Sequence, residues 1–275
     1  MADNKFINIL KNNLLKVSQS ELSKIHKYKD LHKGEECYLF GDGVSLKWFD
    51  LKEFSNKIAI ASSQLPFHNS FNELNAKYLV LTEPFWFYPR IITDYVTNSV
   101  SQPKLSREYR NIVRENPDTQ FFFNFSNYPV IRANNISFLF RDILDPRLPN
   151  NFISNRIPSF GGALRVGILL AIYMGFDHVY LTGCDYSHLP ARNLHWYEKG
   201  KGVFTTHKNY EKEFFKVAKE FINITTITLD GSSEFIDSVT YKEHTGTEPI
   251  YRENTELLDD KSMKILDTWH DYSIY

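Results

Sequence analysis

The stretch RIPSFGGALRVGILLAIYMGFDHVYLTGCDYSH at residues 156–188 constrains the fold more than any other part of this chain. Residues 161–175 form one apolar run that begins with two glycines and ends at Gly175, a residue type that commonly ends helices. Its apolar residues recur at helical spacing, and residues 178–182 then have the composition of a strand. The stretch therefore predicts a loop, a helix, a strand and a second polar loop, as in an α/β fold.

The two loops of this stretch carry groups that suit a phosphate-bearing ligand. A helix N-terminus offers unpaired backbone N–H groups and a partial positive charge, and glycines let a phosphate approach them. Ser159, Gly161 and Gly162 would lie at this N-terminus, and the guanidinium of Arg156 suits a phosphate. Asp185 would follow the strand at the carboxyl edge of the sheet, where open α/β folds bind ligands. An ordinary α/β crossover with a Gly-Gly turn is the alternative.

Composition and charge narrow the classes of protein to which the chain can belong. Its 275 residues can bury a substantial core, and its 42% hydrophobic content is that of a globular protein. The net charge of −1 gives no basic field for nucleic acid. Cys37 and Cys184 form no CxxC pair, so neither a disulfide framework nor a zinc site is predicted. Residues 161–176 are too short to span a membrane, and we expect a soluble cytoplasmic protein.

The chain divides into one large α/β domain with two helical extensions. Residues 1–33 have a single apolar stripe and predict an N-terminal helical extension, with a membrane-surface or partner-binding helix as the alternative. Residues 34–248 form the domain, and residues 249–275 a C-terminal helical tail. The polar, glycine-containing segment 186–206 is predicted to be a lid-like loop.

Three predicted strands, at 36–40, 57–61 and 77–81, each end in a polar loop. The first loop carries the GxG pattern of Gly41 and Gly43, but it lacks the third glycine of the dinucleotide fingerprint and no GxxxxGK[ST] phosphate loop is present. Further strands are predicted at 120–125 and 137–140. Little room is left between the first strands for long helices. The pattern predicts a mostly parallel, Rossmann-like sheet with helices on both faces.

Five short motifs, in this order, resemble the bacterial CMP-dependent sialyltransferases of glycosyltransferase family 42. They are GDGVSLK at 41–47, similar to the family's GNGPSLK; Ser63-Gln64, where the family has Asn-Gln; NRIPSFG at 155–161, similar to QRITSG; VYLTGCD at 179–185, similar to IYLSGID; and THKN at 206–209, where the family has GHSKN. Together they cover roughly residues 36–235. Their order, more than any single motif, carries the resemblance.

The resemblance implies a GT-A-like domain and a glycosyltransferase of cell-surface polysaccharide biosynthesis. Such an enzyme moves a sugar, here sialic acid or a related acidic sugar, from a CMP-activated donor to a glycan hydroxyl, with inversion and without a metal. It implies no cofactor beyond the donor substrate, and its partners are that donor and the glycan acceptor. Peripheral association with the inner face of the membrane and homo-oligomerisation are left open.

The resemblance also implies roles for particular residues. His207 would be the general base, Tyr186 and Tyr197 would offer phenol hydroxyls to the leaving phosphate, and Arg156 would pair with a phosphate or carboxylate. Among the residues of this chain, His188 and His195 are rivals for the base. The implied donor-binding residues are Gly41, Asp42, Gly43, Ser45, Ser63, Gln64, Ser159, Gly161, Gly162, Gly183 and Asp185.

Two other functions stay open. The GG…MGF…VYLTGCD pattern also resembles flagellin-modifying glycosyltransferases and 6-hydroxymethylpterin diphosphokinases, and a diphosphotransferase using ATP would need carboxylates such as Asp42 and Asp185 to hold Mg²⁺. A non-catalytic nucleotide-sugar or glycan-binding module is the other. Asp42 also replaces an asparagine of the sialyltransferase motif, and its carboxylate would repel a phosphate unless it binds ribose, a metal or a cation.

Overall fold

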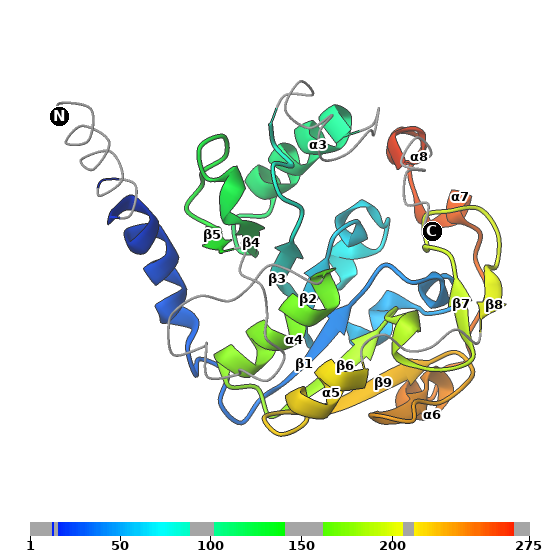
Figure 1. Ribbon diagram of the computed structural model, residues 1–275. Helices are drawn as coiled ribbons and strands as arrows, with labels where there is room; N and C mark the ends of the chain where they lie inside the picture. The colour runs from blue at the N-terminus through cyan, green and yellow to red at the C-terminus, as the bar shows by residue number, and fades with distance from the viewer. Residues whose placement is uncertain (1–12, 14–15, 89–101, 141–161, 206–211, 267–275) are drawn as a thin grey trace.

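An eight-stranded sheet, with every pairing parallel, forms the centre of the computed structural model, which describes residues 13, 16–88, 102–140, 162–205 and 212–266 (Figure 1). The strand order is β10-β9-β6-β1-β2-β3-β4-β5. The strands are β1 Glu36–Phe40, β2 Ile58–Ser62, β3 Ala76–Leu81, β4 Gln120–Asn124, β5 Ile136–Leu139, β6 His178–Thr182, β9 Asn223–Thr228 and β10 Asp237–Thr240. The predicted α/β fold with a mostly parallel sheet is confirmed.

The order of the strands creates one switch point, between β1 and β6. The chain adds β2 to β5 outward on one side of β1, and then returns to place β6 on the other side. Phe40 lies in register with Thr182, so the loops that follow these two strands leave the sheet side by side. In open α/β folds this is where the carboxyl edge of the sheet opens to a ligand.

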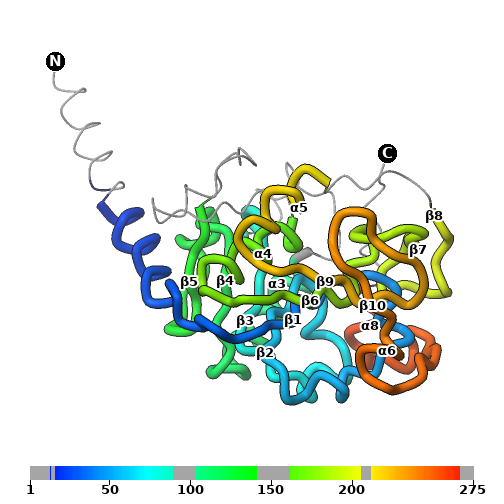
Figure 2. The backbone as a smooth tube through the Cα atoms, turned by 90° about the horizontal axis from the view of Figure 1, so that it is seen from below, coloured from blue at the N-terminus to red at the C-terminus, as the bar shows by residue number. Residues whose placement is uncertain are grey.

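The helices cover both faces of the sheet (Figure 2). The helices α4 Gly162–Met174 and α5 Lys212–Ala218 pack on one face, against side chains such as Leu39 and Ile60. On the other face lie α3 Gln102–Glu115, α6 Tyr241–Thr245, α7 Asn254–Leu257 and α8 Asp260–Leu266. The buried strands thus alternate their side chains between two apolar cores.

The helix that the apolar run predicted is confirmed. It is α4, it is buried along most of its length, and it contacts β1, β2 and β3. Gly175 follows it with φ +82°, the left-handed conformation of a helix end, which glycine adopts without steric cost. Because α4 and β6 belong to one continuous crossover, the packing of this helix fixes where β6 ends and its polar loop begins.

Short 3₁₀ turns connect the first three strands, as the limited chain length between them indicated. The turns are η2 Val44–Lys47, η3 Leu51–Phe54, η4 Leu65–Phe67 and η5 Phe71–Glu73. Their apolar residues, Leu46, Leu51 and Phe54 among them, enter the same core as α6 and α7. The N–H of Asn69, between η4 and η5, also donates to the carbonyl of Leu257 in α7 at 2.8 Å.

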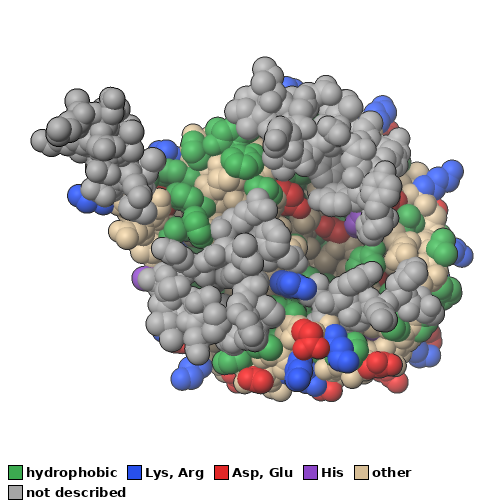
Figure 3. All heavy atoms as spheres, in the orientation of Figure 1, with side chains coloured by type: hydrophobic (Ala, Val, Ile, Leu, Met, Phe, Trp, Pro, Cys, Tyr) green, Lys and Arg blue, Asp and Glu red, His purple; other side chains and the backbone are tan. Residues whose placement is uncertain are grey.

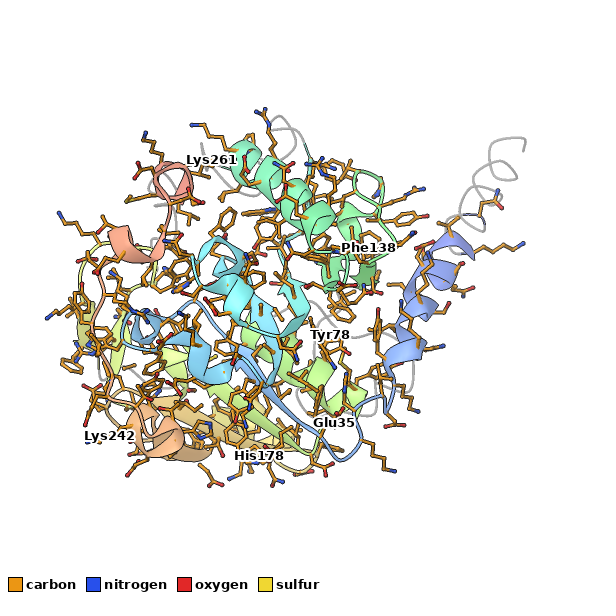
Figure 4. The ribbon with its side chains drawn as sticks, turned by 180° about the vertical axis from the view of Figure 1, so that it is seen from behind. Glu35, Tyr78, Phe138, His178, Lys242 and Lys261 are labelled. Atoms are coloured by element: carbon orange, nitrogen blue, oxygen red, sulfur yellow. The ribbon has the colours of Figure 1, made fainter. Side chains whose placement is uncertain are left out.

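The chain ends differ in how they meet this core. Residues 16–23 are helical and extend from the body beside η1 Lys24–Tyr28 (Figure 1). His32 joins this region to the sheet, since its ring contacts Glu35 and the hydroxyl of Tyr78, both at 2.5 Å. Glu35 and Tyr78 are labelled in Figure 4. At the other end, Lys261 of α8 pairs with Glu108 of α3 at 2.7 Å. No helix in the described ranges has both the length and the apolar character needed to cross a membrane.

Candidate functional site

The loops after β1 and β6 are joined by hydrogen bonds at the switch point. The N–H of Gly41 donates to the carbonyl of Thr182 at 2.8 Å, and the N–H of Gly43 donates to the carbonyl of Gly183 at 2.7 Å. The Asp185 carboxylate accepts from the N–H of Ser45 at 2.9 Å and from its hydroxyl. These bonds bring together residues that the sequence placed more than a hundred positions apart.

Glycines at these positions allow the loops to approach this closely. A Cβ atom on Gly43 would lie 2.6 Å from the carbonyl oxygen of Gly183 and 2.7 Å from Oδ2 of Asp185. Gly183 has φ +65°, and a Cβ there would lie 2.6 Å from Leu46. A larger residue at either position would force the two loops apart.

The carboxylate of Asp185 is hydrogen-bonded to Ser45 within the protein. Burial raises the pKa of Asp185 to about 6, although the hydrogen bonds from Ser45 and the charge of Arg192 oppose this. The side chain is 2% exposed, so its role in the described residues is to fix the relative position of the two loops.

Asp42 lies at the centre of the site and is held from two directions. The N–H of Gln64 donates to both of its carboxylate oxygens at 3.2 Å, and Nε1 of Trp196 donates to one of them at 3.3 Å. Burial raises the pKa of Asp42 to about 6, while the charge of His195 and these hydrogen bonds lower it. The acidic residue at this motif position therefore has hydrogen-bond donors and the imidazole of His195 close to it within the chain.

The loops after β2 and β3 hold strained backbone. Ser63, next to Gln64, has φ +36°, and Phe85, just after β3, has φ +56°. Non-glycine residues adopt such angles at an energetic cost and cluster at functional sites. Both lie at the same carboxyl edge as Asp42, which supports this edge as the functional one.

Glu83 and Tyr109 were not among the predicted site residues. Glu83 follows β3, and burial together with the charge of Asp42 raises its pKa to about 7. Its Oε2, the hydroxyl of Tyr109 on α3 and Oε1 of Gln64 are buried without a hydrogen-bond partner among the described residues. Burial, Asp42 and Glu83 also raise the pKa of Tyr109. A polar loop after the third strand was the only sequence signal for Glu83, and Tyr109 had none.

A second histidine candidate, His195, lies against the first loop. It forms an antiparallel bridge with Gly43, and the N–H of Trp196 donates to the carbonyl of Asp42 at 3.1 Å. Its ring contacts Glu198 Oε2 at 2.8 Å and stacks on Tyr197 at 5.0 Å between centroids. Burial lowers the pKa of His195, but Glu198 and Asp42 together raise it above its ordinary value.

Lys47 holds the segment that carries these residues. Its side chain is 0% exposed, and its Nζ donates to the carbonyls of Glu198 at 2.5 Å and Gly200 at 2.7 Å. It also pairs with Glu253 at 2.7 Å, just before α7. Burial raises the pKa of Glu253, but the hydrogen bonds from Lys47 and from nearby N–H groups lower it to about 2.

The predicted lid-like loop 186–206 contains ordered structure. It includes η8 Asp185–Ser187 and an antiparallel pair, β7 Ala191–Asn193 and β8 Val203–Thr205. Between β7 and β8 lies the segment that Lys47 and Asn254 anchor, the latter through its side-chain amide to the carbonyl of Tyr197 at 2.9 Å. The outer strand carries exposed Phe204, against which the guanidinium of Arg192 stacks.

The other predicted residues are placed as follows. Tyr197 is buried beside His195, whereas Tyr186 is 45% exposed on η8. His188 is buried, burial lowers its pKa to about 4, and its Nδ1 has no partner among the described residues. Gly162 begins α4 with φ +87°. The predicted residues Arg156, Ser159, Gly161 and His207 lie outside the described residues.

A hollow opens on the face shown in Figure 3, below α3 in the view of Figure 1, and acidic and histidine side chains are visible in it. Within the part of the chain that the structure describes, no three His, Cys, Asp or Glu residues are grouped so that they could hold a metal ion. The chemistry available there is that of loop N–H groups, an oriented imidazole and carboxyls with raised pKa values.

Comparison with known proteins found similarity in structure alone. No protein-family model matches the sequence, and no curated protein matches it. The sialyltransferase CstII from Campylobacter jejuni, in complex with the substrate analogue cytidine-5'-monophosphate, is similar with a TM-score of 0.40 and 14% identity, over 86% of this chain and 98% of that one. A mutant of the alpha-2,3/8-sialyltransferase CstII has a TM-score of 0.41 and 13% identity, over 84% and 100% of the two chains. Similarity this low does not by itself assign a family.

Proposed function

We propose that this protein is a glycosyltransferase that moves a sugar from a CMP-activated donor to a glycan hydroxyl. The observation that carries the proposal is the joined pair of loops after β1 and β6. These loops contain the motifs GDGVSLK and VYLTGCD, and they meet at the switch point where open α/β folds bind ligands.

The first loop would hold the nucleotide. Hydrogen bonds fix Gly41, Gly43 and Ser45 against β6, so that this loop is already shaped before a ligand arrives. Preorganisation of this kind lowers the entropic cost of binding. Asp42 has its carboxylate turned to Gln64 and Trp196, which leaves less of its charge to oppose a phosphate.

The leaving phosphate would be stabilised by groups around the start of α4. A monophosphate leaving group needs less charge neutralisation than a diphosphate, and N–H groups, hydroxyls and a guanidinium can supply it. The resemblance gives these roles to Ser159, Gly161, Gly162 and Arg156, and the phenol roles to Tyr186 and Tyr197. On the same basis the proposed sugar is sialic acid or a related acidic sugar, and the transfer is proposed to invert and to need no metal.

The acceptor hydroxyl must lose its proton as its oxygen attacks the anomeric carbon. An imidazole that titrates near neutral pH suits this step. The resemblance assigns the role to His207.

Calorimetric titration with CMP, CDP, ATP and GTP, each with and without Mg²⁺, tests the proposal. We expect CMP to bind with a Kd that does not depend on Mg²⁺. We expect Gly43→Val to abolish binding, because its side chain would displace Asp185, and Gly34→Ala, in the turn before β1, to retain it. Preference for ATP with an absolute need for Mg²⁺ would overturn the proposal in favour of a diphosphotransferase.

A further inference from the structure

His195 and Glu198 form a fixed pair. Oε2 of Glu198 lies 2.8 Å from Nδ1 of His195 and accepts from the His195 backbone N–H at 2.7 Å. Two contacts to one oxygen hold the ring in one orientation, and the stack on Tyr197, with an interplanar angle of 6°, limits its rotation. With Nδ1–H donating to the carboxylate, the other nitrogen, Nε2, carries the lone pair, and no described residue is hydrogen-bonded to it.

The pair belongs to the switch point in space although it lies outside the five motifs. His195 bridges to Gly43, and the next residue, Trp196, bonds to both the backbone and the side chain of Asp42. The His195 side chain is 31% exposed, so part of it is open to solvent beside the first loop. A base oriented by a carboxylate and accessible at its free nitrogen is the arrangement that proton abstraction from a hydroxyl requires.

The surrounding structure keeps this pair in place. Lys47 binds the carbonyls of Glu198 and Gly200, and Asn254 binds the carbonyl of Tyr197. Catalytic groups must be held to within fractions of an ångström, and a buried lysine with three acceptors provides such support. Lys47 is thus a positioning residue for the pair.

We propose that His195, oriented by Glu198, is the general base of the transfer, in place of His207. The inference rests on the proposed function. As the acceptor oxygen forms its bond to the anomeric carbon, its proton passes to Nε2 of His195. The bond from the anomeric carbon to the phosphate oxygen breaks, and its electron pair leaves with CMP. The imidazolium that results is stabilised by Glu198.

The charges around His195 set the direction of the pH dependence. Glu198, Asp42 and Asp185 face the ring and raise its pKa, and Tyr197 covers one side of it. The base must be unprotonated, so kcat rises as the pH increases through this pKa. Removal of the Glu198 charge moves that rise to lower pH and lowers the plateau, because the imidazolium loses its partner.

The first test needs no substrate. In the full-length protein with ¹⁵N-labelled histidine, we expect His195, identified by its loss in His195→Asn, to show a protonated Nδ1 and a pKa above the ordinary value. In Glu198→Gln this pKa falls. An unchanged titration of His195 in Glu198→Gln, or a neutral ring protonated on Nε2, would show that Glu198 does not orient His195.

The second test uses CMP-N-acetylneuraminic acid as donor and lactose as acceptor. We expect His195→Asn to lower kcat by about 100-fold or more with little change in the donor KM. Glu198→Gln lowers kcat by about 10-fold and shifts the pH profile to lower pH. The matched control His26→Asn, an exposed histidine on η1, leaves kcat unchanged.

The outcomes of these tests distinguish a failure of the role proposed for His195 from a failure of the proposed function. Activity that persists in His195→Asn but is lost in His207→Asn, with CMP binding retained in both, overturns the role of His195 and leaves the transferase intact. A wild-type protein that neither binds CMP nor releases it from this donor overturns the proposed function and the base role with it, whereas the His195–Glu198 pair is then still decided by the first test.

Discussion

The two edges of the sheet differ in whether all of their polar side chains find hydrogen-bond partners. At the amino edge, the side-chain amide of Asn135, just before β5, donates to the carbonyls of Val113 and Asn116 at 3.0 Å and of Thr119 at 3.3 Å. At the carboxyl edge, Gln64 and Glu83 each bury an oxygen atom that has no partner among the described residues.

This difference distinguishes polar groups that stabilise the fold from polar groups that are available to a ligand. A polar group removed from water normally finds its hydrogen-bond partner within the protein, as the half-buried Asn135 does. Unpaired polar atoms, raised carboxyl pKa values and left-handed non-glycine residues such as Ser63 coincide at the carboxyl edge. Their coincidence points to an edge arranged to meet a ligand, at some cost to stability.

The largest effect on stability is expected at Lys47, whose ammonium group has three acceptors within the protein. Lys47→Met leaves the carbonyls of Glu198 and Gly200 and the Glu253 carboxylate without their donor, and should lower the free energy of unfolding by about 4 kcal/mol. Guanidinium denaturation measures it. Lys52→Met, in an exposed pair at 3.8 Å, is the control and should change little. A loss below about 1 kcal/mol for Lys47→Met would show that its contacts do not stabilise the fold.

A smaller effect is expected at the amino edge, and it should leave function intact. Asn135→Ala removes three hydrogen bonds to carbonyls and should cost about 2 kcal/mol by the same measurement. CMP binding, followed by calorimetry at a temperature where the variant is folded, should be unchanged. Weakened binding would contradict the division between the two edges.

The carboxyls at the site should make stability fall as the pH rises. The folded-state pKa values of Asp42, about 6, and Glu83, about 7, exceed their ordinary values, so the folded state holds extra protons between about pH 4 and 7. Their stabilising effect is complete below the unfolded-state pKa and is lost as the pH passes the folded-state pKa. Glu83→Gln should flatten this decline and, at pH 8, be more stable by on the order of 1 kcal/mol. Denaturation curves from pH 4 to 8 check it, and an unaltered decline in Glu83→Gln would contradict it.

The smallest effect is expected far from both edges. Lys261→Ala removes the pair between α8 and α3, but Lys261 is 67% exposed, so solvent screens the pair and the melting temperature should hardly change. Thermal unfolding at low and high salt measures it. A large, salt-sensitive loss would mean that the surface pairs of this protein contribute as much as its buried ones.

The sequence predicted most strands of the central sheet and their polar ends because these depend on local pattern, but it did not predict β10 or the pair β7 and β8. The strand at 36–40 was placed as found, and α4 within one residue. Parallel strands align their ends, so Gly41 and Asp185 could be assigned to one edge before any contact was known.

The contacts that complete the site depend on distant residues, which a local pattern does not specify. Lys47 is the last residue of the motif GDGVSLK, yet its burial is due to Glu198, Gly200 and Glu253. Tyr109 lies on α3 like any core aromatic. The three-residue spacing of His195 and Glu198 is visible in the sequence, but their position at the switch point follows from the bridge between His195 and Gly43.

The pairing of β1 with β6 also determines when the site can form during synthesis. Thr182 is synthesised 142 residues after its neighbour Phe40. Strands paired over such a distance close slowly, since the loop between them must be ordered first. We therefore expect strands β2 to β4 to associate first and the loop after β1 to stay incomplete until β6 arrives, so a nascent chain that stops before residue 178 should not bind the proposed ligand CMP.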